Sequence, residues 1–92
     1  MLPYCVYILY SEVDHQLYAG FTINLIKRVD QHFKGEVLST AHRRPLQLIF
    51  CEYYLNKGDA IRREKYFKTS QGKRALKLML VDTLNTLKPS LP

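Results

Sequence analysis

The chain has little of what marks several common classes of protein. Its 92 residues include no tryptophan, two cysteines, four glycines and four prolines. Cys5 and Cys51 lie far apart and form no CxxC or histidine-paired spacing, which argues against a zinc or redox motif and favours two reduced, buried thiols. No apolar run approaches the roughly 18 residues that cross a bilayer, and the first residues lack the basic segment of a signal peptide. We therefore expect a soluble, cytoplasmic protein with no membrane partner.

Acidic residues are also scarce compared with basic ones. Eight Asp and Glu stand against 14 Lys and Arg, which gives a net charge of +6. This balance favours an anionic partner such as nucleic acid, although charge alone does not identify one. Apolar residues make up 47% of the chain, enough for one compact core. We expect a single domain over residues 1–84 and a frayed tail over residues 85–92.

Two short segments rich in aromatic and β-branched residues are expected to be strands, namely Tyr4–Ser11 and Leu17–Thr22. The polar residues between them indicate a hairpin. If its turn is Asp14-His15, Tyr7 would face Thr22 across the pair. Because side chains alternate along a strand, Tyr18 would lie on the same face of the sheet as Tyr7. Two phenols would then project from one side of the sheet.

A helix is expected next, from about Leu25 to Lys34, between a cap at Thr22 or Asn24 and a stop near Gly35. At 100° per residue, its apolar face would consist of Leu25, Ile26, Val29 and Phe33. Arg28 and His32 are four residues apart and would lie together along one edge of that face. We expect both at the boundary between core and solvent, where a partly buried site would form.

Residues 36–45 have the character of a loop and include the basic run Thr40–Arg44. A third strand is expected at Leu46–Tyr54. Its alternation would put Leu48 and Phe50 on one face and Ile49, Cys51 and Tyr53 on the other. Apolar residues on both faces indicate a strand in the middle of its sheet or covered on both sides.

The remainder of the chain predicts two helices, from about Ala60 to Ser70 and from Lys73 to about Leu84, separated by a break at Gln71-Gly72. In the first of these, Glu64 falls in the middle of the apolar stripe. A carboxylate there is costly unless it is paired, hydrogen-bonded or bound to a metal ion. An ion pair with Arg28 or Lys68 would be a purely structural explanation, and a metal site would be a functional one.

Four segments, taken in order, resemble the motifs of the GIY-YIG nuclease domain family: Cys5-Val6-Tyr7, Tyr18-Ala19-Gly20, Lys27–His32 and residues 60–68 with Glu64. No single motif is specific, but their order, spacing and combination are. The similarity extends to about Leu80. It is greatest to the small, stand-alone bacterial members, which are themselves similar to the N-terminal incision domain of the excision-repair nuclease. Cys5 replaces the glycine of the first motif and Ala19 the isoleucine of the second, and both are packing changes that the fold should tolerate. For the further polar site residue that some members have near the C-terminal end, Asn85 is the candidate.

The resemblance implies an α+β fold in which a small three-stranded antiparallel sheet is flanked by helices, in the order ββαβαα. It also implies a metal-dependent endonuclease that hydrolyses DNA phosphodiester bonds, with a role in DNA repair or recombination as one possibility. Glu64 would hold a divalent cation, Mg²⁺ in preference to Mn²⁺. Arg28 would clamp the scissile phosphate, a task that suits a bidentate guanidinium.

In the same resemblance, Tyr7, assisted by Tyr18, would take the proton from the attacking water. A free phenol titrates near pH 10, so the cation and Arg28 would have to lower the pKa. His32 would orient the phenol or share the role of general base. The side chains expected to contact nucleic acid are Lys27, His42, Arg43, Arg44, Lys68 and Lys73.

Two other functions remain open from the sequence. One is a non-catalytic nucleic-acid-binding module of the same fold, and the other is a structural or oligomerising domain whose charge is incidental. A chain of this size has no room for a separate DNA-reading domain, so backbone contacts would give weak, salt-sensitive binding with low sequence specificity. A homodimer or a protein partner would be needed to supply higher sequence specificity.

Overall fold

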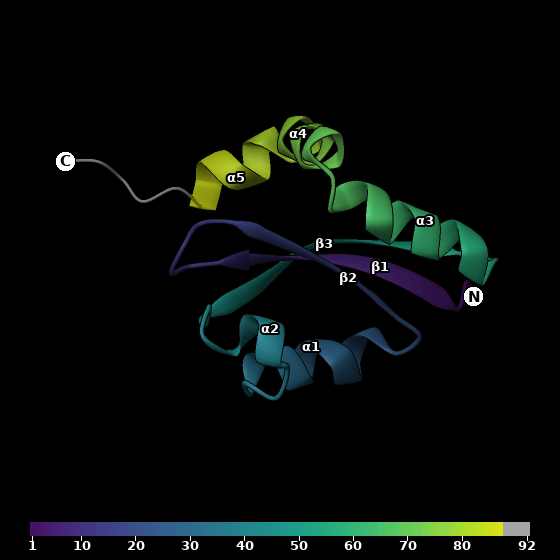
Figure 1. Cartoon of the computed structure of the whole chain (residues 1–92), viewed down its shortest axis with the longest axis horizontal. Coiled ribbons are helices and arrows are strands. Elements are labelled where there is room, and N and C mark those ends of the chain that lie inside the picture. The colour runs from purple at the N-terminus through teal and green to yellow at the C-terminus, as the bar shows by residue number, and fades with distance from the viewer. Residues whose placement is uncertain (88–92) are drawn as a thin grey trace.

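A computed structural model describes residues 1–87 of the chain. In chain order its elements are β1 (Tyr4–Ser11), β2 (Leu17–Thr22), α1 (Leu25–Phe33), α2 (Leu38–Ala41), β3 (Leu46–Tyr54), α3 (Lys57–Phe67), α4 (Ser70–Met79) and α5 (Val81–Leu87). The three strands form one antiparallel sheet in the order β2-β1-β3. Helices α1 and α2 cover one face, and α3, α4 and α5 lie on the other (Figure 1). The α+β architecture is as predicted, but two helices are added to the predicted order ββαβαα: the short α2, and α5, which is split from the predicted last helix.

The central strand β1 divides the core into two clusters. Val6 and Ile8 face α3 and α4, where they pack with Phe67 and its buried neighbours. Cys5, Tyr7 and Leu9 point to the opposite face, toward α1. Both clusters bury their β1 side chains almost completely. Tyr7 is therefore held in the middle of the sheet on the α1 side.

The hairpin register differs from the prediction by two residues. The loop between β1 and β2 holds five residues, so the predicted two-residue turn at Asp14-His15 is wrong. Tyr7 pairs with Gly20, and Thr22 pairs with Cys5. A shift of two residues leaves the faces unchanged because side chains alternate with a period of two. Tyr18 therefore shares a face with Tyr7, as predicted.

Strand β3 begins and ends as predicted, but it lies at an edge of the sheet and is covered on both faces. A β-bulge interrupts its pairing with β1, so that Phe50 pairs with Ile8 while Leu48 pairs with Leu9. Leu48 and Phe50 consequently face opposite sides, and the prediction that they share a face is wrong. One extra residue in a strand inverts the alternation beyond it.

The helices after β3 differ from the prediction at their boundaries. Gly72 does not break the chain but lies inside α4, and Thr69 caps this helix by accepting the Gly72 N–H at 3.0 Å. A Cβ at position 72 would overlap the Tyr66 carbonyl, so glycine permits the close approach of α3 and α4. The break falls instead at Lys68-Thr69, between α3 and α4, and Leu80 divides the predicted last helix into α4 and α5.

The structure describes only the first three residues of the predicted tail, 85–92. Residues 85–87 belong to α5, and the rest of the predicted tail lies outside the described residues.

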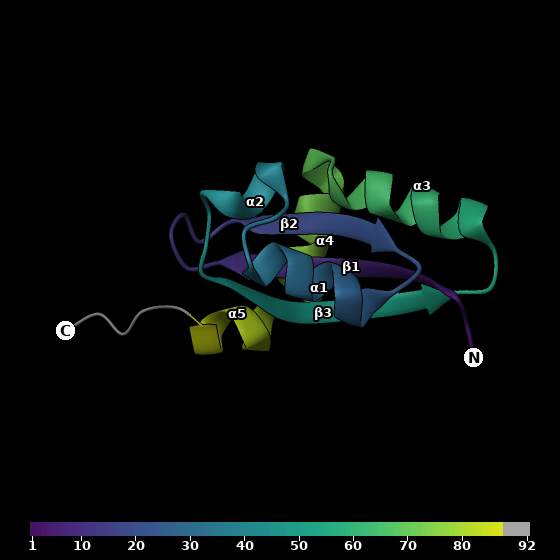
Figure 2. The same ribbon diagram turned by 90° about the horizontal axis from the view of Figure 1, so that it is seen from below.

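Seen from below, α1 crosses the sheet and α3 runs along its β2 side (Figure 2). No helix within residues 1–87 is long and apolar enough to cross a membrane. Both cysteines are free thiols, Cys5 buried and Cys51 partly buried.

Candidate active site

Tyr7 lies at the centre of the α1 side of the sheet, with 1% of its surface exposed. The phenol ring passes over its cross-strand partner, Gly20. A Cβ at position 20 would overlap the Cζ and hydroxyl atoms of Tyr7. The glycine therefore makes the space in which the ring lies, as glycines within strands do where another group approaches closely.

A chain of buried hydrogen bonds starts at the Tyr7 hydroxyl. His32 Nε2 lies 2.7 Å from that hydroxyl, and His32 Nδ1 lies 2.7 Å from Thr40 Oγ1. The Thr40 hydroxyl donates in turn to the Val37 carbonyl at 3.5 Å. This direction fits a neutral imidazole that carries its proton on Nδ1, donates it to Thr40 and accepts from Tyr7 at Nε2. We call Tyr7, His32 and Thr40 the buried chain.

His32 was predicted at the boundary between core and solvent, and this prediction is wrong. The inward stripe of α1 contains Val29 and His32, and His32 is fully buried. Ile26 and Phe33, predicted on the apolar face, are 86% and 46% exposed. The imidazole takes the interior position because hydrogen-bond partners for both ring nitrogens stand there.

Arg28 occupies the flank of α1 as predicted and is partly buried. Its Nη1 donates to Gln31 Oε1 at 3.1 Å. Its positive charge acts on both members of the Tyr7–His32 pair: it opposes the rise in the pKa of Tyr7 and adds to the fall in the pKa of His32. Arg28 is therefore close enough to influence proton exchange between them.

Burial sets the charge state of the Tyr7–His32 pair. It raises the pKa of Tyr7 to about 12, a rise that Arg28 opposes. Burial, reinforced by Arg28, lowers the pKa of His32 to about 4. At neutral pH both side chains are uncharged. The expected lowering of the phenol pKa is therefore absent from the protein alone and would require a bound cation and substrate.

Tyr18 connects the buried chain to Glu64. Its ring is partly buried and meets the His32 ring edge-on, with centroids 5.3 Å apart. Lys68 Nζ lies 5.8 Å from the centroid of the Tyr18 ring and 2.9 Å from Glu64 Oε2. Glu64 is thus paired with one of its two anticipated partners, and that partner lies against Tyr18. We call Glu64 and Lys68 the rim pair, because their side chains are 18% and 51% exposed.

A divalent cation would find one carboxylate at this position. Within residues 1–87, no three His, Cys, Asp or Glu side chains gather in a way that could hold a metal ion. Mg²⁺ is commonly bound by one or two carboxylates, with water and substrate phosphates as its other ligands. Glu64 therefore fits a cation that is shared with a phosphate, and not one that the protein holds alone.

Basic side chains line two grooves along the β2 side of the site. A groove of about 200 Å³ contains Tyr18, Lys68 and Lys73. The next groove, of about 290 Å³, also contains Lys73 and adds Lys77 and Arg43. We call these together the basic strip. It brings together three of the predicted nucleic-acid contacts, Lys68, Lys73 and Arg43, the first two in the same groove as the predicted catalytic Tyr18.

The other predicted nucleic-acid contacts are more dispersed. Lys27 is exposed on α1, and His42 and Arg44 are exposed after α2, outside both grooves of the basic strip. Arg43 binds Asp14 through Nε at 2.7 Å and Nη2 at 3.3 Å. This interaction lowers the pKa of Asp14 to about 2 and ties the β1–β2 loop to the segment before β3. Much of the Arg43 charge is thereby compensated.

Two residues of the site were missed by the sequence analysis as functional positions. Thr40 was read as part of a basic loop, and only the short α2 brings its hydroxyl to His32. Gly20 was recognised as a motif residue, but its contact with Tyr7 depends on the hairpin register. The presence of a glycine within a predicted strand was the one sign in the sequence that another group, here the Tyr7 ring, packs closely against the backbone.

Comparison with known proteins identifies the class to which this fold and site belong. The profile of the GIY-YIG catalytic domain matches residues 3–77. The chain therefore belongs to the GIY-YIG family, as its motifs predicted. This membership indicates a nuclease domain, and nucleases of this family generally use a divalent metal ion.

The relatives are bacterial proteins named UPF0213. One from Pediococcus pentosaceus is 50% identical over 60% of this chain and 59% of its own length. One from Limosilactobacillus reuteri is 34% identical over 92% of this chain and 91% of its own. UPF0213 protein YazA from Bacillus subtilis is 45% identical over 60% and 57%. Their bacterial origin agrees with the predicted resemblance to bacterial members, and no solved structure matches the chain significantly.

Proposed function

We propose that this protein is a metal-dependent endonuclease that hydrolyses DNA phosphodiester bonds with low intrinsic sequence specificity. The observation that carries the proposal is the buried chain, in which a phenol donates to a neutral imidazole at 2.7 Å. Binding of nucleic acid alone requires no buried acceptor for a tyrosine proton. Arg28 lies beside the same tyrosine and the rim pair lies beside its neighbour Tyr18, in keeping with chemistry on a phosphate.

Tyr7 is the proposed general base, acting together with His32. The hydroxyl of Tyr7 would accept a proton from the attacking water while its own proton moves to His32 Nε2. Thr40 would stabilise the resulting imidazolium by accepting a hydrogen bond from its Nδ1–H group. Because Tyr7 is almost covered, this water would be held at the hydroxyl and shielded from bulk solvent. Within residues 1–87, Tyr7 is the motif tyrosine whose hydroxyl has a hydrogen-bond partner that can receive its proton.

Arg28 would bind the scissile phosphate and neutralise charge that develops on it. Glu64 would bind Mg²⁺ or Mn²⁺, which supplies further charge neutralisation and assists departure of the 3′ oxygen. A cation at Glu64 competes with the ammonium of Lys68. Lys68, once released from the carboxylate, would be available to a DNA phosphate beside Tyr18.

The proposed substrate path follows the basic strip. Its lysines are exposed and suit phosphate contacts, which position DNA without reading its sequence. Binding should therefore weaken steeply with salt. Repair or recombination is the kind of process that such an activity would serve, and a second copy or a protein partner would be needed to direct it to particular sites.

The test is cleavage of supercoiled, linear and branched DNA with Mg²⁺ or Mn²⁺ by the native protein and by Glu64→Gln. We expect cleavage by the native protein and loss of about 100-fold or more in the variant, in line with losses on removal of one catalytic electrostatic group. Glu36→Gln, an exposed carboxylate outside the site, is the matched control and should cut normally. Equal cutting by native protein and Glu64→Gln, or none by either, would overturn the proposal.

The ion pair between Glu64 and Lys68 favours one alternative, a non-catalytic nucleic-acid-binding module. In that case the pair is structural and no cation displaces the lysine. The two functions differ in metal dependence. The binding module would hold DNA equally with Mg²⁺ or with a chelator, whereas the endonuclease would bind a cation more tightly when DNA is present.

A further inference from the structure

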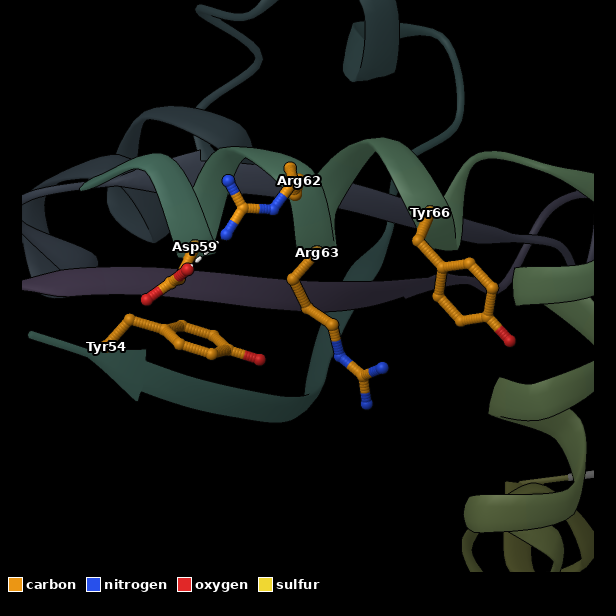
Figure 3. Close-up of a pocket in the computed structure, with 5 residues that line it drawn as sticks. All are labelled: Tyr54, Asp59, Arg62, Arg63 and Tyr66. Carbon is orange, nitrogen blue, oxygen red and sulfur yellow. Dashed lines mark hydrogen bonds and ion pairs between the residues drawn. The ribbon is translucent and has the colours of Figure 1, made fainter. Parts of the chain in front are cut away.

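A groove of about 410 Å³ lies on the α3 side of the sheet, next to the end of β3 (Figure 3). Its lining consists of Tyr54, Asp59, Arg62, Arg63 and Tyr66. The groove is shallow and wide open to solvent, so it suits a ligand that lies against the surface. None of these residues takes part in the proposed cleavage reaction, so the groove requires its own explanation.

Helix α3 separates this groove from the proposed active site. At about 100° per residue, Arg62, Arg63 and Tyr66 project from one flank of the helix. Glu64 and Lys68 project from the opposite flank. A strand of nucleic acid that passes over α3 would therefore meet the rim pair on one side and this groove on the other.

Hydrogen bonds hold the groove in shape. Glu52 Oε1 accepts from the Tyr54 hydroxyl at 2.8 Å and from Arg63 Nε at 2.7 Å. The guanidinium carbon of Arg63 lies 4.3 Å from the ring centroid of Phe67 and 5.6 Å from that of Tyr66. Side chains fixed in advance lose little conformational freedom when a ligand binds.

The charges in the groove favour a flat, neutral ligand. Asp59 is paired with Arg62, and Glu52 with Arg63, so each acid is matched by one arginine. A free phosphate would gain little from a site that is close to neutral. Figure 3 shows the ring of Tyr54 on one side of the Arg63 guanidinium and that of Tyr66 on the other. Such rings stack well on nucleobases.

Arg63 also leaves hydrogen-bond donors for the edge of a base. Among the residues that the structure describes, it donates only through Nε, to Glu52. Its two Nη groups face the groove in Figure 3 and can donate to the oxygen and nitrogen acceptors of a base edge. A base inside a duplex has its faces covered by its neighbours, so only an unpaired base can stack here.

We propose that this groove binds an unpaired base of single-stranded DNA. The net charge of +6 attracts the strand, and the exposed ring of Tyr66 holds one of its bases. This binding does not depend on cleavage. It extends the proposed function to DNA that carries a single-stranded segment next to a duplex, with the duplex on the basic strip and the free strand on the far flank of α3.

The test is a fluorescence anisotropy titration of a short labelled oligothymidine at low salt, with a chelator present so that no cleavage takes place. We expect Tyr66→Ala to weaken binding by about 5- to 100-fold, the usual effect of removing one stacking ring. Tyr66→Phe keeps the ring and should bind within about twofold of the native protein. Tyr53→Ala removes an exposed tyrosine from the other face of β3 and should also leave binding unchanged.

A duplex of the same length separates base binding from general attraction. Tyr66→Ala should leave duplex affinity unchanged, whereas Lys73→Ala should weaken it. Circular dichroism checks folding, and Tyr66→Leu, which keeps apolar bulk without a ring, replaces the alanine variant if that variant unfolds. Native affinity of Tyr66→Ala or Tyr66→Leu for the oligothymidine, or equal weakening toward the duplex, would overturn the inference. So would a loss in Tyr53→Ala as large as that in Tyr66→Ala.

Discussion

The buried chain and the rim pair lie on either side of Tyr18 and differ in how they are held. In the buried chain, Tyr7, His32 and Thr40 are at most 1% exposed and their hydrogen bonds are completed by folding. In the rim pair, Glu64 and Lys68 keep contact with solvent, and they are held by their ion pair and by the contact of Lys68 with the Tyr18 ring. The proton-handling half of the proposed site is therefore prepared in the free protein. The cation-binding half has to be completed by its ligands.

This difference predicts opposite responses to mutation. A change in the buried chain should alter stability as well as activity, because buried polar groups that lose a partner are costly. A change in the rim pair should alter metal or DNA binding while stability stays nearly constant. The following measurements test the comparison, from the largest expected effect to the smallest.

Gly20→Ala should give the largest loss, about 3 kcal/mol of unfolding free energy, because the new Cβ would overlap the buried ring of Tyr7. Urea unfolding followed by circular dichroism measures it. Gly58→Ala is the matched control, since its Cβ would meet only Arg62 Nη1 at 3.7 Å and alanine is the better helix former. Equal midpoints for the two variants would show that Tyr7 is not held against Gly20.

The pH dependence of stability should reveal the buried imidazole. The pKa of His32 is about 4 in the folded protein and near its ordinary value of 6.5 when unfolded. Between these values the unfolded chain binds more protons, so stability falls as the pH drops through this range and levels off below it. The expected loss between pH 7 and pH 4 is roughly 3 kcal/mol.

Urea unfolding at several pH values, with His32→Gln and the exposed His42→Gln, isolates this effect. His32→Gln should lose the extra pH dependence, and His42→Gln should keep it. Asp14, with a pKa of about 2 in the folded protein, contributes only at lower pH, where its ion pair with Arg43 is lost. A profile for His32→Gln that follows the native one would mean that His32 is not buried as a neutral side chain.

Thr40→Val should cost about 2 kcal/mol, because it keeps the shape of the side chain and leaves His32 Nδ1 without its partner. Thermal unfolding measures the change. The neighbouring Ser39→Ala alters an exposed hydroxyl and should stay within about 0.5 kcal/mol of the native protein. If both variants lose the same stability, the Thr40 hydroxyl does not support the imidazole.

Lys68→Gln should have the smallest effect, below about 0.5 kcal/mol, because Lys68 is half exposed and solvent screens its ion pair with the partly exposed Glu64. The same urea titration measures it. A loss of about 2 kcal/mol or more of unfolding free energy would show that the rim pair supports the fold as strongly as the buried chain does. In that case the structural explanation of Glu64 would be favoured over metal binding.

The strands and the common face of the two tyrosines could be predicted because these properties are local. Alternation over a few residues places Tyr7 and Tyr18 on one side of the sheet for any even register shift. The error in the predicted turn therefore left the predicted face of both tyrosines correct. The family motifs were likewise readable as short segments at fixed spacing. In each case the information lies within one or two neighbouring elements.

Several of the errors concern contacts between separate elements. His32 looked like a boundary residue because its partners, Tyr7 and Thr40, belong to a strand and a short helix elsewhere in the chain. Gly72 looked like a helix breaker because its role depends on the carbonyl of Tyr66 in another helix. The bulge in β3 depends on its pairing with β1. A pattern in one segment carries no information about these partners.

The central position of β1 has a consequence for how the protein is synthesised. β1 is synthesised before both of its partner strands and can form a hairpin with β2 once Leu17–Thr22 have been added. Its other edge pairs with β3, where Tyr4 meets Tyr54, so that edge stays open until some fifty more residues have been added. An apolar strand with an open edge invites pairing with other chains. The growing chain is therefore most exposed to aggregation just before β3 arrives, and slow translation of residues 23–45 should lower the yield of folded protein.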